Sequence, residues 1–332
     1  MVLILRFASP IVLKNKNILL LFILVFLIGI GYLLTRGLPW GRGETKLFPH
    51  FNKEEVNRIE VKKGDDEIKL IKENSRWVVE TKEKALADEQ KVANLLETTG
   101  GLSRSELIST NPEKQKDMQV DESGIRIRLF RDDSLTADYY LGKSGPGYGT
   151  TYIRKEGEDR VYLVSEWLSG FSPTAEWRNL VVLKFVADDV SSVAVWHQGN
   201  SFTLEKKDGE WKLTGEEKSQ ALENSLEPGS KESPAKGSLD SKKIQTFITT
   251  LSSLRANDLQ MKGNLELAGL NNPQWKYVIN LKDGSLYELA IGNQDENEDY
   301  FVKTNQSEII YILPSYTVED FPQKIEDLVS SD

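Results

Sequence analysis

Apolar and polar residues alternate in the early part of the chain, between residues 56 and 79, and this period predicts a three-stranded β-meander. The apolar positions are Val56, Ile59, Val61, Ile68, Leu70, Trp77 and Val79. The period then changes to that of a helix, which Asp88 can cap and whose apolar face contains Val92, Leu95, Leu96 and Thr99. Four further strands are expected at residues 125–131, 136–141, 151–154 and 160–164, and a short helix near Trp167.

The same order of elements returns in the second half of the chain. Residues 185–195 repeat residues 51–61 in their phenylalanine, their acidic pair and their three aliphatic positions, and Trp211 corresponds to Trp77. Asp240 begins a second helix with Ile244, Phe247, Ile248 and Leu251 on its apolar face. Strands follow at residues 276–281, 286–291, 300–303 and 308–313, with a short helix near Tyr316. The sequence therefore predicts two tandem copies of one α+β domain, each with a mainly antiparallel sheet and a packed helix.

The correspondence between the copies also sets the expected domain boundaries. Repeat domain 1 covers residues 48–173, a junction covers 174–184, and repeat domain 2 covers 185–332. The second copy is longer because of residues 215–238, which are rich in Ser, Glu, Lys, Gly and Pro. Such a stretch cannot bury a core, so we expect a flexible insertion there.

An uncharged apolar run at residues 18–34 precedes both copies. As a helix it would span about 25 Å, near the short end of what a bilayer core needs. We therefore predict an N-terminal flank at residues 1–16, one transmembrane helix at 17–35 and a linker at 36–47. A cleaved signal peptide is the alternative, but its apolar region is normally shorter and ends in small residues, whereas this run continues into residues 35–40.

Composition narrows the possible partners. The chain carries 51 acidic and 42 basic residues, a formal net charge of −9, so it gains nothing from releasing phosphate counterions and nucleic acid is not expected as a partner. The absence of cysteine removes disulfides, thiolate nucleophiles and zinc–thiolate sites.

Residues 137–144, which include Gly142 and Lys143, fit a relaxed phosphate-binding Walker A pattern. That chemistry needs a glycine-rich loop followed directly by a helix. Here bulky strand-forming residues precede Gly142, and Gly-Pro-Gly-Tyr-Gly follows Lys143-Ser144. The second copy keeps the glycine, as Gly292, without the lysine. We therefore expect no nucleotide hydrolysis.

Residues 295–299 place oxygen ligands at alternate positions, as calcium loops do. Tyr300 stands where the turn glycine belongs and Gln306 where the last ligand belongs, so a solvated acidic loop is favoured. The only histidines, His50 and His197, fall at different positions of the repeat, and no catalytic triad or metal set can be assembled from them by spacing.

Two further sets of residues recur in both copies. The acidic pairs Glu54-Glu55 and Asp188-Asp189 precede strands and are expected to face solvent. Trp77 and Trp211 could stack on sugars if they were exposed, but their repeat-equivalent places in alternating strands favour packing between meander and helix. The sequence therefore assigns no catalytic, cofactor-binding or metal-ligating residue.

Several of these features together resemble a bacterial family catalogued as domain of unknown function 4340. They are the V-x-x-I-x-V strand from Val56, Trp77, the helix from Asp88, Leu141-Gly142 and the V-Y-x-V strand from Val161. Residues 268–273 resemble the family's G-L-x-x-P turn, from which the first copy departs at residues 117–122. The resemblance covers the chain after about residue 48.

The genes of that family are similar to genes that lie beside those for the permease and auxiliary subunits of gliding-motility-type ABC transporters. The resemblance implies a non-enzymatic accessory or scaffold protein of a bacterial envelope complex, without a cofactor, whose partners are the membrane and such transporter subunits. Its place would be the bacterial inner membrane, as a single-pass protein with extracytoplasmic domains. The basic residues flanking the span are nearly balanced between its two sides, and only the N-terminal amine favours this orientation.

Two other functions remain open at this point. The first is an extracytoplasmic module that binds a glycan or a peptide in the cleft between the copies, and the second is an envelope hydrolase. An enzyme should cluster polar residues in one site, whereas a sugar-binding module should expose aromatic side chains.

Overall fold

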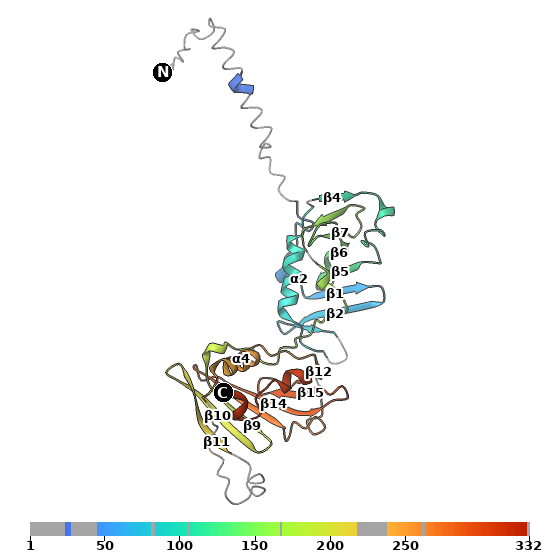
Figure 1. The fold of residues 1–332 in the computed structure, drawn as a ribbon. Coiled ribbons are helices and arrows are strands. Elements are labelled where there is room, and N and C mark those ends of the chain that lie inside the picture. The colour runs from blue at the N-terminus through green and yellow to red at the C-terminus, as the bar shows by residue number, and fades with distance from the viewer. Residues whose placement is uncertain are drawn as a thin grey trace, which may run out of the picture.

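The computed structural model describes residues 24–27, 45–80, 84–104, 106–166, 168–217, 238–260 and 263–330. Most of the predicted transmembrane helix lies outside these ranges, and only residues 24–27 are described, as one helical turn (Figure 1). Within the described parts of the chain, none of the helices combines the length and apolar character that crossing a bilayer requires.

The first domain is one eight-stranded antiparallel sheet with a helix, α2 (Glu89–Gly101) (Figure 1). The sheet has the order β3-β2-β1-β5-β6-β7-β8-β4. Its strands are β1 (Arg58–Lys63), β2 (Asp66–Glu73), β3 (Arg76–Val79), β4 (Glu106–Ser109), β5 (Ile125–Arg131), β6 (Ser134–Ser144), β7 (Thr151–Lys155) and β8 (Val161–Val164). Short 3-10 helices lie at Lys53–Glu55, Pro112–Lys114 and Ser169–Phe171.

The second domain repeats this topology with the order β11-β10-β9-β13-β14-β15-β16-β12. Its elements are β9 (Val190–His197), β10 (Asn200–Lys207), β11 (Glu210–Glu217), α4 (Ser241–Ser252), β12 (Asp258–Gln260), β13 (Trp275–Leu281), β14 (Leu286–Gln294), β15 (Tyr300–Thr304), β16 (Ile310–Leu313) and α5 (Ser315–Glu319). Two 3-10 helices lie at Ala187–Asp189 and Ile325–Leu328. Because the two strand orders are the same, the internal repeat and the α+β class are confirmed.

The helices form as their capping residues and apolar faces predict. The Asp88 carboxylate accepts hydrogen bonds from the backbone N–H groups of Gln90 and Lys91, and Asp240 does the same for Lys242 and Lys243. The buried residues of α2 are Val92, Leu95, Leu96 and Thr99, and those of α4 include Ile244, Phe247, Ile248 and Leu251. Trp77 and Trp211 are 4% and 8% exposed within the two cores, so the packing interpretation of these tryptophans is correct.

The edge strands β4 and β12 were not expected from the sequence. They contain four and three residues, too few for a clear alternation, and they are strands because their backbones pair with β8 and β16. Two predicted boundaries also need correction. Leu47, assigned to the linker, is fully buried in the first core and donates its N–H to the Leu102 carbonyl at 2.8 Å. Residues 215–217, predicted as the start of the insertion, belong to β11, which pairs with β10 through Glu217.

Each domain is framed by two short extended pieces of chain. An opening segment, residues 45–47 or 180–182, pairs with the residues that follow the helix, as in the 2.9 Å hydrogen bond from Val182 N–H to the Leu254 carbonyl. A closing segment, residues 177–179 or 328–330, pairs with the residues that precede the helix. In the first domain Asp88 N–H donates to the Trp177 carbonyl at 2.7 Å, and in the second Asp240 N–H donates to the Leu328 carbonyl at 2.8 Å.

At the junction the closing segment of the first domain runs directly into the opening segment of the second. Trp177 is fully buried in the first core, whereas Leu183 is 1% exposed in the second. Among the described residues, Arg178 forms an ion pair with Asp258 at 2.7 Å and Arg255 one with Asp88 at 3.5 Å, and both pairs bridge the domains. The residues expected to be a simple junction are therefore structural parts of both domains.

We expect Trp177→Ala to destabilise the protein by about 3–5 kcal/mol, because it removes a fully buried tryptophan side chain from the first core beside the junction. Trp196→Ala is the matched control, since Trp196 is 43% exposed and should change stability far less. Urea denaturation followed by circular dichroism measures both. Equal losses in the two variants would contradict the role given to Trp177.

Replacing residues 218–237 with a shorter Gly-Ser loop should leave the urea midpoint nearly unchanged, because halving a flexible loop changes its closure free energy by only about 0.6 kcal/mol. Removing Gly215, Glu216 and Glu217 as well should destabilise the domain, since they pair with β10. A loss of about 2 kcal/mol or more from the first replacement alone would show that the segment packs on the domain.

Candidate functional site

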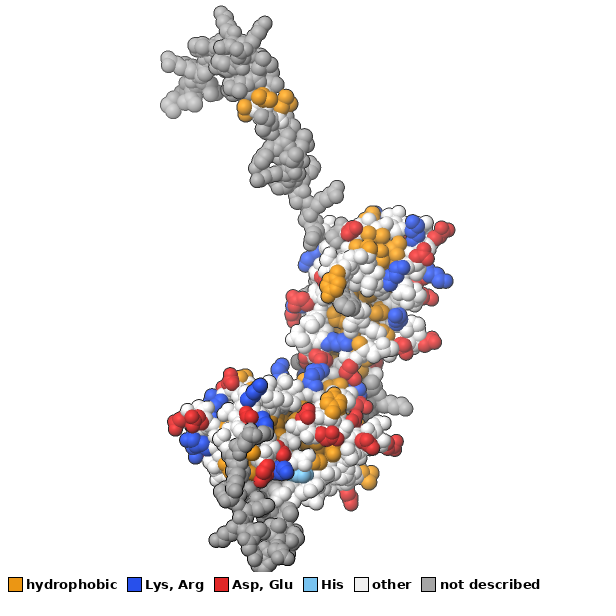
Figure 2. Space-filling view, viewed as in Figure 1, with side chains coloured by type: hydrophobic (Ala, Val, Ile, Leu, Met, Phe, Trp, Pro, Cys, Tyr) orange, Lys and Arg blue, Asp and Glu red, His pale blue; other side chains and the backbone are white. Residues whose placement is uncertain are grey.

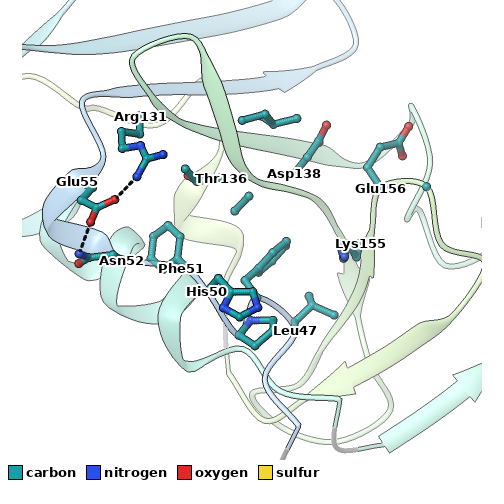
Figure 3. Close-up of a pocket in the computed structure, with 15 residues that line it drawn as sticks. Leu47, His50, Phe51, Asn52, Glu55, Arg131, Thr136, Asp138, Lys155 and Glu156 are labelled. Atoms are coloured by element: carbon teal, nitrogen blue, oxygen red, sulfur yellow. Dashed lines mark hydrogen bonds and ion pairs between the residues drawn. The ribbon is translucent and has the colours of Figure 1, made fainter.

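The first domain carries a cleft of about 720 Å³ where three pieces of chain meet (Figure 3). One wall is the stretch that leads from the opening segment toward β1. A second wall is the end of β5 together with the first half of β6, and a third is the end of β7 with the residues that follow it. The lining residues are Leu47, Phe48, Pro49, His50, Phe51, Asn52, Glu55, Arg131, Leu135, Thr136, Ala137, Asp138, Lys155, Glu156 and Gly157.

Hydrogen bonds fix the first two walls against each other. The turn between β5 and β6 places Asp132 at a positive φ of 53°, and the side chain of Asn57, directly before β1, holds this turn. Asn57 Nδ2 donates to Asp132 Oδ1 at 2.6 Å, and Asp132 N–H donates to Asn57 Oδ1 at 2.8 Å. Beside them Arg131 Nη1 meets Glu55 Oε2 at 2.7 Å (Figure 3). The hydrogen bonds from Arg131 and then from Asn52 lower the pKa of the Glu55 carboxyl.

The inner wall of the cleft is aromatic. Phe48 packs on Tyr139 with ring centroids 5.5 Å apart, and the Tyr139 hydroxyl shares a 2.7 Å hydrogen bond with Thr99 of α2. Complete burial raises the pKa of the Tyr139 hydroxyl well above its ordinary value. Tyr139 is therefore a neutral structural support for the ring that lines the cleft.

The charged residues at the far side of the cleft are already paired within the protein. Arg126 makes two hydrogen bonds to Asp138, at 2.9 and 2.8 Å, and these raise the pKa of the Arg126 guanidinium. Lys155 contacts Glu158 at 3.2 Å, and Glu156 contacts Arg154 at 3.1 Å. The cleft thus offers aromatic and aliphatic walls with a neutralised polar rim, an arrangement suited to binding.

A second groove, of about 820 Å³, lies on the other domain between α4 and the chain around α5. Phe247 and Phe321 meet there edge to face, with ring centroids 5.7 Å apart. Lys243 lines the groove and donates from Nζ to the Val329 carbonyl at 2.8 Å. Lys91, at the same place in α2, donates to the Glu176 carbonyl at 2.8 Å, directly before the closing segment of the first domain.

The Walker-like residues lie in strand β6, and the described chain continues through a turn into β7. Lys143 N–H donates to the Met118 carbonyl at 3.0 Å. A Cβ on Gly142 would lie 2.2 Å from that carbonyl oxygen, and a Cβ on Gly292 would lie 2.0 Å from the Ala268 oxygen. The glycine is therefore explained by the close approach of a loop to a β-bulge inside the strand.

The loop that makes this approach has the same backbone in both copies although its sequence differs. Gly269 of the G-L-x-x-P turn has a φ of +69°, and Gln119, its counterpart in the first copy, has a φ of +56°. A non-glycine residue in this conformation is uncommon. In sequence, residues 117–122 depart from the family's G-L-x-x-P turn, although their backbone has the same positive φ at this position.

The acidic loop at residues 295–299 uses its carboxylates for turn formation. Asp295 Oδ1 accepts hydrogen bonds from the N–H groups of Asn297 and Asp299, at 2.8 and 3.0 Å. Asp299 Oδ1 accepts one from Ser315 N–H at 3.1 Å. Among the described residues no group of three or more potential metal ligands is found.

The two histidines lie in different domains. His50 lines the cleft of the first domain. His197 stacks on Trp275 with centroids 4.7 Å apart, and burial lowers the pKa of its imidazole. The acidic pairs lie in the 3-10 helices that precede β1 and β9, and only Glu55 of these four residues reaches the cleft. The cleft itself was not predicted, because it forms from chain segments that are far apart in sequence.

We expect Gly142→Ala to destabilise the first domain by about 1–3 kcal/mol, since the new Cβ overlaps a backbone carbonyl that cannot move alone. Lys143→Ala should leave the denaturation midpoint unchanged, because Lys143 contributes its backbone N–H to the bulge. Gly101→Ala is the glycine control, since no atom lies within 4 Å of its added Cβ. A stable Gly142→Ala variant would refute this explanation of the glycine.

Comparison with known proteins gives a family without an assigned activity. The family described as Domain of unknown function (DUF4340) matches residues 77–273 and, in a second match, residues 232–332. No curated protein and no solved structure matches the chain. The two matches together cover more than half of the sequence and include parts of both copies. The chain therefore belongs to the DUF4340 family.

Proposed function

We propose that this protein is a non-enzymatic, membrane-anchored scaffold of a bacterial envelope complex, in which its two domains hold subunits of an ABC transporter. The observation that carries this proposal is the junction. Closing and opening segments meet without a spacer and are hydrogen-bonded into both domains, so surfaces on the two domains keep a fixed spacing. A fixed spacing is what a scaffold needs to hold two partners.

The anchor part of the proposal is supported by the apolar run at residues 18–34. In the one described turn of this run, Leu24, Val25, Phe26 and Leu27 are between 54% and 69% exposed (Figure 2). Four consecutive large apolar side chains on one helical turn are stable in lipid and unfavourable in water.

The surface character of the domains fits a protein partner. Acidic and basic side chains are interspersed on the visible face of both domains (Figure 2). Together with the net charge of −9, this pattern is unlike the basic stripe of a nucleic-acid-binding surface.

A ligand-binding module remains the second candidate because of the cleft in the first domain. Its aromatic wall and volume of about 720 Å³ fall within the range of small-ligand and peptide sites. The cleft lies within one copy, whereas the sequence had suggested a site between the copies.

The scaffold proposal predicts that the tagged full chain stays in the membrane fraction after carbonate washing and co-purifies, from detergent-solubilised native membranes, with transporter permease or auxiliary subunits. A flexible Gly-Ser insertion after Asn179 should reduce this co-purification, because it releases the spacing between the domains. The same insertion within residues 218–237 is the matched control and should have no effect. Thermal denaturation checks that both variants fold.

Three results would count against the proposal. Release of the chain by carbonate would refute the anchor. Equal co-purification with both insertions would refute the fixed spacing. Retention of a small glycan or peptide, without transporter subunits, would favour the ligand-binding module.

A further inference from the structure

The two copies differ at a position that lines the cleft of the first domain. In β6 Ala137 pairs with Leu129 of β5, and in β14 Tyr287 pairs with Ile279 of β13. These pairs occupy the same place in the two sheets, because β5–β6 and β13–β14 are equivalent hairpins. The first copy therefore has a methyl group where the second has a phenol.

In the second domain the tyrosine fills its own site. The ring of Tyr287 packs on Phe185, with centroids 5.1 Å apart and planes tilted by 41°, and both rings border the second core. Tilted aromatic pairs at this separation are favourable beyond the area they bury. The chain itself thus shows which chemical group this part of the fold accommodates.

In the first domain Phe51 corresponds to Phe185, and its ring lines the cleft without such a tyrosine. Ala137 lines the cleft and is 2% exposed. At the rim stands Leu135, which pairs with Phe130 and is 50% exposed. The half-buried ring of Phe51, the small Ala137 and the exposed Leu135 surround a space. In the second copy, Tyr287 fills the corresponding place by packing on Phe185.

Charge restricts what could fill it. Five charged side chains line the cleft, and each has an oppositely charged partner in the protein: Glu55 with Arg131, Asp138 with Arg126, Lys155 with Glu158 and Glu156 with Arg154. A charged ligand would have to break one of these pairs or lose water without compensation. An uncharged ring meets neither cost.

We propose that this cleft binds an uncharged aromatic side chain, Tyr or Phe, presented by a partner polypeptide, packed on Phe51 as Tyr287 packs on Phe185. The identification of the partner as a polypeptide rests on the proposed scaffold function, whereas the aromatic class rests on the repeat. The first copy is thus the copy that recognises a partner through this contact, and the second has its equivalent site closed by its own tyrosine.

The test uses the full chain in lipid nanodiscs and N-acetyl-4-fluorophenylalaninamide as the probe, followed by fluorine NMR. We expect saturable binding, competition by N-acetyltyrosinamide and none by N-acetylleucinamide at the same concentration. Ala137→Tyr places in the first copy the side chain that closes the second, and should weaken probe binding by about tenfold or more.

Because Ala137 is buried and its replacement could alter folding, a second variant keeps the test decisive. Leu135→Asp changes a half-exposed rim residue, so it should fold normally, and its charge should weaken probe binding. Leu286→Asp is the matched control: Leu286 holds the same hairpin place in the second copy and is 40% exposed. It should leave probe binding unchanged.

Unchanged binding in Leu135→Asp, or equal competition by the leucine and tyrosine amides, would overturn the proposal. The outcome is separable from that of the scaffold. If the probe binds as expected while transporter subunits do not co-purify, the cleft stands and the scaffold fails. If Leu135→Asp keeps co-purification and the probe never binds, the scaffold stands and the aromatic site fails.

Discussion

Two sets of main-chain hydrogen bonds flank Asn179. On one side Asp88 N–H and Asn179 N–H bond the closing segment to the chain before α2, and on the other Val182 N–H and Ala256 N–H bond the opening segment to the chain after α4. Each set completes the frame of a different domain. Backbone bonds of this kind cannot slip by one residue without reversing the side chains at Trp177 and Leu183, which are buried in opposite cores. Core packing therefore fixes the register of the junction, and the junction fixes the relation between the domains.

Asp88 shows how closely helix formation and domain contact are connected. Its carboxylate caps α2, its N–H donates to Trp177, and its second oxygen lies 3.5 Å from Arg255 of the other domain. Arg255 and Asp88 are partly exposed, so their ion pair by itself contributes little. The cap of α2 and the backbone hydrogen bond to Trp177 therefore contribute most of the stabilisation at Asp88. The ion pair with Arg255 is a weaker contact between the domains.

Local patterns in the sequence were sufficient for the elements whose formation is local. Strand β5 has the predicted bounds, and both helix caps and both buried helix faces agree with the 3.6-residue period. The edge strands β4 and β12 escaped prediction because partner strands, rather than alternation, define them. The positive φ of Gln119 escaped because only the tertiary contact with Gly142 requires it. The cleft escaped although one signal was present in the sequence, the exchange of Ala137 for Tyr287 between aligned copies.

Because no residue lies between the closing segment and the opening segment, further copies of the domain can be added in one particular way. The peptide bond between Asn179 and Leu180 ends one unit and begins the next, so a duplicated unit joins its neighbour in frame and at a set rotation, without a linker having to evolve. Residues 328–330 hold the same backbone bonds in the second domain as residues 177–179 hold in the first. The unit is thus concatenable, like the repeats of a solenoid, and nearest-neighbour contacts would determine the pitch of a longer array.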